Sequence, residues 1–290
     1  MSPKLCASCI RCLVDRQEER IAGLKEEETR AAYMKQLCRI IAEAGPEDTV
    51  PVLVERVNVI YRQLFGELTD FTEIKKEFNR LMLSAEKELE VKIRASADPV
   101  KTAMLYARAA NYIDFGAYSH VSRDTLSTLL EKAAADELEE EVYELLCRDL
   151  ETAKELVYVT DNCGEVVADK LVIRILKERW RDLHVTVLVR GAQALNDATL
   201  EDARQTGLSE EADVMANGSG VTGTPLACIS PQAKELLEKA DVIIAKGQGN
   251  YETMNGCGLN VYYSFLCKCD WFQKRFGLSQ NKGVLIREKD

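Results

Sequence analysis

Residues 156–170 read Leu-Val-Tyr-Val-Thr-Asp-Asn-Cys-Gly-Glu-Val-Val-Ala-Asp-Lys, and the type of secondary structure they predict changes along the stretch. The first five residues are apolar or β-branched, which predicts a buried strand. From Glu165 the apolar side chains recur at helical spacing, which predicts a helix over 165–180. Asp161 and Asn162 follow the strand directly, where open α/β sheets bind their ligands. We therefore expect a functional site at this turn.

The alternation of strand and helix continues to the end of the chain. Further strands are predicted at 184–189, 213–216, 241–245 and 283–287, with helices at 198–206 and 231–239 and a less regular region at 251–276. Strands that alternate with helices form a mainly parallel sheet with helices on both faces. The predicted fold class is therefore α/β.

The first half of the chain has helical patterns and no convincing strand. Helices are predicted within 9–44, from Pro51 to Phe65, from Asp70 or Thr72 towards Pro99, from Asp98 to about Ile113, and from Asp124 through Leu146. We therefore expect two domains, an all-helical bundle or cap over residues 1–150 and an α/β domain over residues 151–290.

Composition and charge limit the classes of function. The 290 residues are 46% apolar and 30% charged, as in a globular protein, and the net charge of −10 argues against a nucleic-acid partner. The sequence has no apolar run of the roughly 18 residues that a membrane helix needs, and its first residues lack the basic-then-apolar layout of a signal peptide. We expect a cytoplasmic protein with no membrane partner; the sequence does not indicate its oligomeric state.

Three of the ten cysteines, Cys6, Cys9 and Cys12, recur at intervals of three residues. On a helix they would lie roughly along one face, which suits a metal or redox site. No fourth ligand stands nearby, and free cysteines often serve as small buried apolar residues. Packing is the favoured interpretation, with a metal or redox role as the alternative.

Polar and glycine-rich segments follow four of the predicted strands. They contain Asp161 and Asn162, then Asn196 and Asp197, then residues 217–224, and then residues 246–252. Because the carboxyl ends of parallel strands share one edge of the sheet, we expect these segments to converge. Convergence of four polar loops favours a catalytic site, although Asp and Asn also cap helices and form turns routinely.

The residue types in these loops indicate one kind of chemistry. Asp161, Asn162 and Asp197 offer oxygen ligands, which suit Mg²⁺ or Mn²⁺. The glycine-rich loops can direct backbone N–H groups at an anion, and Lys246 adds a positive charge. A divalent cation, a phosphate-binding loop and a lysine together describe metal-assisted phosphoryl chemistry.

Two other motifs have competing interpretations. Gly218, Gly220 and Gly223 match the dinucleotide-binding spacing, but Pro225 follows and the next helix starts only near Ser230, so NAD binding is disfavoured. Asn111 and Asp114 are three residues apart, so on a helix they point the same way. From composition alone, capping of a helix end is the simpler interpretation of that pair.

Three motifs together resemble the damage-control phosphatase family, formerly a domain of unknown function, which includes acidic-residue methyltransferase-like proteins. They are Asp161-Asn162-x-Gly164-Glu165, Asn196-Asp197 followed by Asp202-Ala203, and Lys246-Gly247-x-Gly249-Asn250-Tyr251. The early Cys9-x-x-Cys12-Leu13 and Asn111-x-x-Asp114-Phe115-Gly116 resemble the microbial and archaeal-type branch. Cys6, ahead of the cysteine pair, departs from that pattern.

The resemblance implies a Rossmann-like three-layer α/β/α sandwich with a helical amino-terminal region. It also implies metal-dependent hydrolysis of small phosphate esters, such as sugar phosphates or damaged phospho-metabolites, with Mn²⁺, Co²⁺, Ni²⁺ or Mg²⁺ as cofactor. By motif, the metal ligands are Asp161, Asn162 and Asp197; Lys246 contacts the phosphoryl group, with Ser219 as a weaker candidate; and Asn111, Asp114 and Asn250 line the substrate side. We further expect Asp114 or Glu165 to orient the attacking water.

Two other classes of function stay open at this point. One is methyl transfer from S-adenosylmethionine, which the glycine-rich loops and the alternative family name suggest. The other is a non-enzymatic binding module in which the cysteines hold a structural metal.

Overall fold

The computed structural model describes residues 4–111 and 137–288. The chain forms two compact units, residues 1–70 and 71–290. The domain boundary expected at residue 150 marks a change in secondary structure, and as a domain boundary it stays a prediction. The helices that follow residue 70 belong to the same compact unit as the sheet.

The first unit consists of the helices α1 (Ala7–Ile21), α2 (Glu27–Ala42) and α3 (Val50–Phe65). Pro51 lies in the first turn of α3, where a missing N–H costs nothing, and Gly66 follows its last residue, as predicted. One apolar face of each helix is buried in a shared core: Leu13, Ile21, Tyr33, Leu37, Leu53 and Val57.

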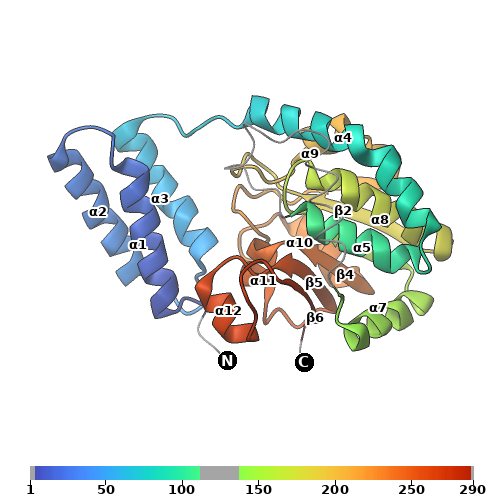
Figure 1. The fold of residues 1–290 in the computed structure, drawn as a ribbon. Helices are drawn as coiled ribbons and strands as arrows, with labels where there is room; N and C mark the ends of the chain where they lie inside the picture. Colours follow the sequence, from blue (N-terminus) through green and yellow to red (C-terminus); the bar gives the residue numbers. More distant parts are fainter. Residues whose placement is uncertain (1–3, 112–136, 289–290) are drawn as a thin grey trace. The chain divides into compact units, whose positions relative to one another are not determined.

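The second unit is built on a six-stranded sheet (Figure 1). Its strands are β1 (Glu155–Val159), β2 (His184–Val189), β3 (Asp213–Ala216), β4 (Val242–Lys246), β5 (Val261–Leu266) and β6 (Gly283–Arg287). The strand order is β3-β2-β1-β4-β5-β6, and every neighbouring pair is parallel except β5 and β6. The predicted mainly parallel sheet is confirmed.

Alternate residues of β1 face two separate apolar cores. Leu156 and Tyr158 pack in one core and Val157 and Val159 in the other. The first core is completed by α4 (Thr72–Ala95), α5 (Pro99–Ala110), α7 (Glu140–Thr152), α8 (Glu165–Arg179) and α9 (Leu200–Gln205), and the second by α10 (Pro231–Lys239), α11 (Gln248–Met254) and α12 (Asp270–Phe276). Helices therefore cover both faces, and the three-layer α/β/α sandwich is confirmed.

The sequence missed β5, which lies in the region interpreted as irregular. Its six residues are all buried between β4 and β6, so they lack the alternation that marks a half-exposed strand. The first part of the helix predicted from Asp124 lies outside the described residues, and α7 begins at Glu140. Across 4–111 and 137–288, no helix has both the length and the apolar character needed to cross a bilayer.

Candidate active site

The turn between β1 and α8 carries Asp161 and Asn162. Gly164 precedes the helix with φ +68°, and a Cβ there would lie 2.3 Å from the ring of Phe78, so only glycine fits. The Gly164 N–H donates to Asn79 Oδ1 of α4 at 2.6 Å. Helix α4 therefore helps to fix the turn that presents the two polar side chains.

The loop after β2 lies against this turn. Asn162 and Asp197 form an isolated antiparallel bridge, and the Ala198 N–H donates to the Asp161 carbonyl at 2.8 Å. The Asn196 side-chain amide donates to Asn162 Oδ1 at 2.7 Å. The structure thus brings together Asp161, Asn162 and Asp197, the three side chains expected to hold a metal.

Two buried residues of α4 hold the second loop in place. Lys75 Nζ lies 2.9 Å from the Asp197 carbonyl oxygen and 2.6 Å from Asp202 Oδ2. The Asn79 amide donates to the other Asp202 oxygen at 3.0 Å. Sequence reasoning missed Lys75 and Asn79, because a lysine and an asparagine on a helix ordinarily face solvent. Asp202 appeared only as part of a motif.

Arg190, the residue after β2, is another site residue that the sequence analysis missed. Its side chain is buried, and its Nε donates to Asp197 Oδ2 at 2.5 Å. Its Nη1 donates to Thr224 Oγ1 at 3.2 Å, and its Nη2 lies 3.9 Å from Asp161 Oδ1. The guanidinium therefore touches both acids of the predicted metal site. A basic residue directly after a strand was the available signal.

Lys246, the last residue of β4, lies in the same buried cluster. Its Nζ donates to Glu165 at 2.7 Å, to Asp169 at 2.9 Å and to the Ala107 carbonyl at 2.9 Å. Those three bonds use every hydrogen of the ammonium group. Contact between Lys246 and a phosphoryl group, which stays a prediction, requires one of these partners to be exchanged.

Asn111, directly after α5, links Asp161 to Glu165. Its amide donates to Asp161 Oδ2 and to Glu165 Oε2, both at 2.8 Å. Asn162 donates to the same two oxygens at 2.7 and 3.1 Å. Glu165 therefore has both oxygens occupied, since Lys246 binds the other one. Asp114, the alternative water-orienting residue and a predicted substrate contact, lies outside the described residues.

The two remaining predicted substrate contacts make internal hydrogen bonds. Asn250 is fully buried, and its amide donates to the carbonyls of Thr160 and Lys246 at 2.9 and 2.6 Å. The Ser219 hydroxyl accepts from the Val221 N–H at 3.2 Å. Both side chains stabilise the loops around the site, and their contact with substrate stays a prediction.

Glycine permits the close approach of β4 to the acids. Gly247 has φ +82°, and a Cβ there would lie 2.1 Å from Asp161 Cγ. The Asp161 carboxyl group thus packs directly on the backbone that follows Lys246. By contrast, the glycine-rich segment after β3 opens no helix of its own, because α10 begins only at Pro231, as predicted.

Burial makes the site unfavourable for negative charge. It raises the pKa of Asp161 to about 7, Asp197 and Glu165 act in the same direction, and Arg190 opposes them. Burial also raises the pKa of Asp197 although Arg190 opposes this. Because ionised carboxylates close to one another repel, a cation placed between them would be stabilising.

The net formal charge of the site would be balanced by a divalent cation. Five carboxylates meet three basic groups in the ion pairs of this cluster, a formal excess of two negative charges: Asp161, Glu165, Asp169, Asp197 and Asp202, against Lys75, Arg190 and Lys246. In the described ranges, no three His, Cys, Asp or Glu side chains form a complete metal-binding group. A cation here would therefore use the Asn162 amide oxygen beside two carboxylates, a set that suits hard cations.

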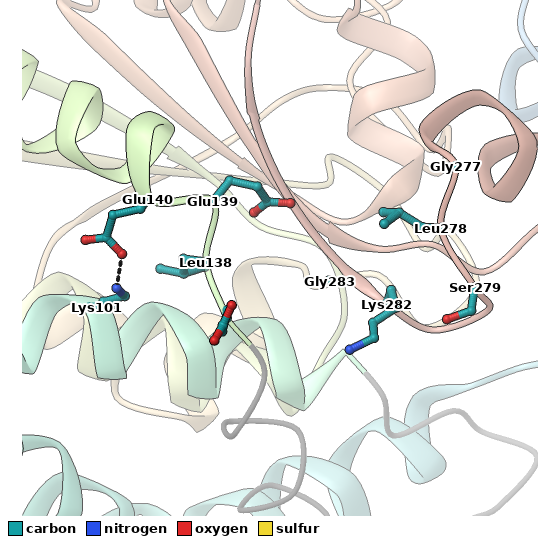
Figure 2. A pocket seen from close by; sticks show the side chains of 10 residues that line it. Lys101, Leu138, Glu139, Glu140, Gly277, Leu278, Ser279, Lys282 and Gly283 are labelled. Atoms are coloured by element: carbon teal, nitrogen blue, oxygen red, sulfur yellow. Dashed lines mark hydrogen bonds and ion pairs between the residues drawn. The ribbon is translucent and has the colours of Figure 1, made fainter.

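A separate cavity of about 790 Å³ lies near α5, α7 and the start of β6 (Figure 2). Lys101 and Glu140 form an ion pair at one side of it, while Ser279 and Lys282 lie at the other. Of the residues predicted for the metal or the substrate, those within the described ranges do not line this cavity.

The three amino-terminal cysteines lie in the first unit. Cys6 precedes α1, and its Sγ lies 3.2 Å from Cys9 Sγ, while Cys12 follows one turn later. All three are partly buried, and none forms a disulfide with another described cysteine. The cysteine-held metal considered from the sequence stays a prediction.

Comparison with known proteins identifies relatives that match nearly the whole chain. A damage-control phosphatase of Archaeoglobus fulgidus is 29% identical over 95% of each chain, and damage-control phosphatase PH1575 of Pyrococcus horikoshii is 27% identical over 99% of each. An uncharacterised protein of Methanocaldococcus jannaschii is 30% identical over 97% of this chain and 94% of its own.

A solved structure shares the fold. The crystal structure of the Pyrococcus horikoshii protein superposes with a TM-score of 0.80 at 24% identity, covering 98% of this chain and 99% of that one. The family model described as the damage-control phosphatase ARMT1-like domain matches residues 5–284. The chain therefore belongs to the damage-control phosphatase ARMT1-like family.

Proposed function

We propose that this protein is a divalent-metal-dependent phosphatase that hydrolyses small phosphate esters, such as sugar phosphates or damaged phospho-metabolites. The observation that carries the proposal is the convergence of Asp161, Asn162 and Asp197 in a partly buried cluster with an excess of negative charge. The curated relatives named damage-control phosphatases support the reaction class. The cytoplasmic location expected from the sequence belongs to the same proposal.

The two acids and Asn162 Oδ1 would hold the cation, with Mn²⁺, Co²⁺, Ni²⁺ or Mg²⁺ as candidates. When bound, a cation supplies Lewis-acid polarisation of the phosphoryl group. The protein orients the ligands through amides: Asn111 and Asn162 both donate to Asp161 Oδ2, and Asn196 donates to Asn162 Oδ1. Outer hydrogen bonds of this kind fix ligand geometry.

The loop after β3 is the proposed phosphate-binding segment. Asn217 Oδ1 accepts from the N–H groups of Gly191 and Ser219, at 2.9 and 2.8 Å, and fixes the loop's path. Thr224, at the other end of the loop, joins it to Arg190 and Asn250. Glycines let such a loop present backbone N–H groups to an anion. We propose that the substrate phosphate binds between this loop and Asp161.

Lys246 and Glu165 would hold the amide groups of the site in position. Lys246 makes a direct ion pair of 2.7 Å with Glu165, and Glu165 in turn accepts hydrogen bonds from the amides of Asn111 and Asn162. Glu165 orients the attacking water in this proposal only by exchanging one of these amides. Asp114 remains the alternative for that step.

The test is phosphate release from an aryl phosphate and a panel of small phosphate esters, with each divalent metal in turn. We expect turnover that needs the metal, is abolished by EDTA, and falls at least about 10³-fold in Asp161→Asn. The matched control is Asp241→Asn, a carboxyl group at the opposite edge of the sheet, which should retain full activity. Folded Asp161→Asn with wild-type turnover would rule out the proposed metal site.

Methyl transfer gains no support from the site. In nucleotide-binding folds of this strand order, the first turn is glycine-rich and an acid near the end of β2 binds the ribose. Here that first turn carries Asp161 and Asn162, and Arg190 follows β2. Calorimetry with S-adenosylmethionine should therefore show no binding.

A further inference from the structure

The Arg190 guanidinium occupies a central position among the acids of the site. It is 1% exposed, one of the largest fully buried side chains among the described residues. Its Nε is bonded to Asp197 and its Nη1 to Thr224, so the group is anchored from two sides. Arginine suits such a place because its planar group keeps its charge and donates in fixed directions.

The third nitrogen of Arg190 is incompletely used. Within the described part of the chain, Nη2 is buried and has no hydrogen-bond partner. It lies 3.9 Å from Asp161 Oδ1, too far for a hydrogen bond but close enough for a strong charge interaction. Asp161 Oδ2 is bonded to two amides, whereas Oδ1 faces Arg190 Nη2 at 3.9 Å; the charge of Lys268 acts on this carboxyl group too, more weakly than that of Arg190.

Arg190 therefore differs from the other two basic groups of the cluster. Lys246 serves Glu165 and Asp169, and Lys75 serves Asp202 and the Asp197 carbonyl. Among these three basic groups, Arg190 alone reaches the carboxyl groups of both Asp161 and Asp197. It contacts the same two acids that a bound cation would contact, from the protein side.

We propose that Arg190 is a built-in counter-ion that stabilises the site when no metal is bound. This inference rests on the proposed function, since it assigns Arg190 a role towards the cation that Asp161 and Asp197 would hold. Without a cation, the carboxyl groups of the partly buried Asp161 and the buried Asp197 repel each other. Arg190 reduces that repulsion and holds Asp197 in position, and it weakens cation binding because like charges repel.

If Arg190 formed only a structural ion pair, its removal would have a different effect on stability. Removing a structural arginine lowers stability equally with and without metal. Removing a counter-ion that shares its carboxylates with the metal makes the protein depend on the metal. The coupling between Arg190 and Mn²⁺ is therefore the quantity to measure, by thermal unfolding and by Mn²⁺ binding followed with electron paramagnetic resonance, neither of which needs turnover.

The experiment compares wild type with Arg190→Met, which keeps side-chain length and removes the charge. We expect the rise in Tm on adding saturating Mn²⁺ to be larger in Arg190→Met by at least about 5 °C, and the Mn²⁺ dissociation constant to be at least about ten-fold lower. The matched control is Arg174→Met, because Arg174, in the second half of α8, also joins several carboxylates, Glu86, Glu90 and Glu211, none of which is a site residue. It should leave both quantities at wild-type values.

The outcomes separate the inference from the proposed function. Wild-type protein that takes up no Mn²⁺, Co²⁺, Ni²⁺ or Mg²⁺ contradicts the proposed function and the inference with it. Wild-type uptake with an unchanged Tm rise and affinity in Arg190→Met overturns the inference alone.

A second variant covers failure of Arg190→Met to fold with or without Mn²⁺. Arg190→Lys keeps the charge and loses the two-sided anchoring. Folding without Mn²⁺ and one bound Mn²⁺ per chain in Arg190→Lys support the counter-ion role, whereas an unfolded metal-free Arg190→Lys shows that shape and not charge is decisive.

Discussion

The two edges of the parallel sheet carry similar side chains in opposite electrostatic states. At the carboxyl edge, burial and neighbouring acids raise the pKa of Asp161 and Asp197. At the amino edge, Asp241 accepts backbone N–H bonds from Lys154 and Glu155 at 2.7 and 2.9 Å, and these bonds hold its pKa below the ordinary value. Solvation and partners, not residue type, decide the sign of the shift.

The difference shows where the fold gives up stability. Acids at the amino edge are solvated and satisfied, so they stabilise the free protein. Acids at the carboxyl edge are held close together in a poorly solvated place, which costs stability until a cation arrives. Each experiment below changes one edge and uses the other, or an equivalent position, as its control.

Asp161→Asn should remove most of the electrostatic difference between the two edges, since it removes a negative charge that destabilises the metal-free protein. The folded pKa of about 7 exceeds the ordinary 3.8, so the folded state binds more protons and stability falls as pH rises between about pH 4 and pH 7. We expect metal-free Asp161→Asn to be more stable than wild type by about 1–3 kcal/mol at pH 8, with no difference near pH 3.

Urea denaturation across that pH range measures the effect. Asp241→Asn is the control with the opposite sign, because Asp241 has a lowered pKa and its charge stabilises the folded state. Equal destabilisation by the two substitutions would show that burial of the ionised Asp161 carboxylate does not lower the stability of the folded protein.

Lys246→Met should produce the largest loss of stability. It leaves Glu165 and Asp169 buried without their shared cation, which costs about 3–5 kcal/mol at neutral pH. Chemical denaturation measures the loss. Lys154→Met, whose ion pair with Asp182 at the amino edge is exposed, should change stability by less than about 0.5 kcal/mol. Comparable losses in both variants would contradict this account of the buried cluster.

Gly247→Ala tests whether close packing on Asp161 matters beyond backbone conformation. The added methyl group would lie 2.1 Å from Asp161 Cγ, so the carboxyl group must move. Because a displacement of about 1 Å at a catalytic group can lower the rate about 10²-fold, we expect the rate of phosphate release to fall by about that factor. Gly256→Ala is the matched control, because Gly256 has a similar φ of +86° but no atom of a described residue lies within 4 Å of the added Cβ. It should keep full activity, and a loss shared by both variants would point to backbone strain instead.

The sequence predicted those parts of the fold that depend on local patterns. The strands at 184–189, 213–216 and 283–287 and the helix at 231–239 agree with the structure, because apolar runs and Pro231 mark their limits. Strand β5 was missed because its Val-Tyr-Tyr-Ser-Phe-Leu run has neither the alternation of a half-exposed strand nor the run of β-branched residues that marked the equally buried β4.

For the site, strand ends identified Asp161, Asn162 and Asp197, since topology alone brings such loops together. Arg190 also follows a strand directly and was overlooked, but Lys75 and Asn79 could not be found in this way. Their importance comes from burial between elements distant in sequence, and no local pattern encodes the 122 residues that separate Lys75 from Asp197. The direction of Lys246, into the cluster, likewise depends on the positions of Glu165 and Asp169 on α8.

Substitution of His184, the first residue of β2, gives the smallest expected change in stability. It tests whether charge stabilises the amino edge of the sheet. The ring nitrogens of His184 lie 2.8 Å from Glu155 and 3.0 Å from Asp213, and these hydrogen bonds raise its pKa. A raised folded pKa means that the stabilisation is fully present below about pH 6.5 and is lost as pH rises through the folded pKa. Because the imidazole is 53% exposed, solvent screens the pair and the contribution stays below about 1 kcal/mol.

Unfolding of His184→Gln and wild type at pH 5.5 and pH 9 measures this contribution: the variant should be less stable only at the lower pH. Salt should remove that difference, as for any solvated ion pair, while leaving the buried cluster around Asp161 nearly unaffected. A pH-independent difference would mean that His184 acts by packing, and the amino edge would then owe its stability to contacts and not to charge.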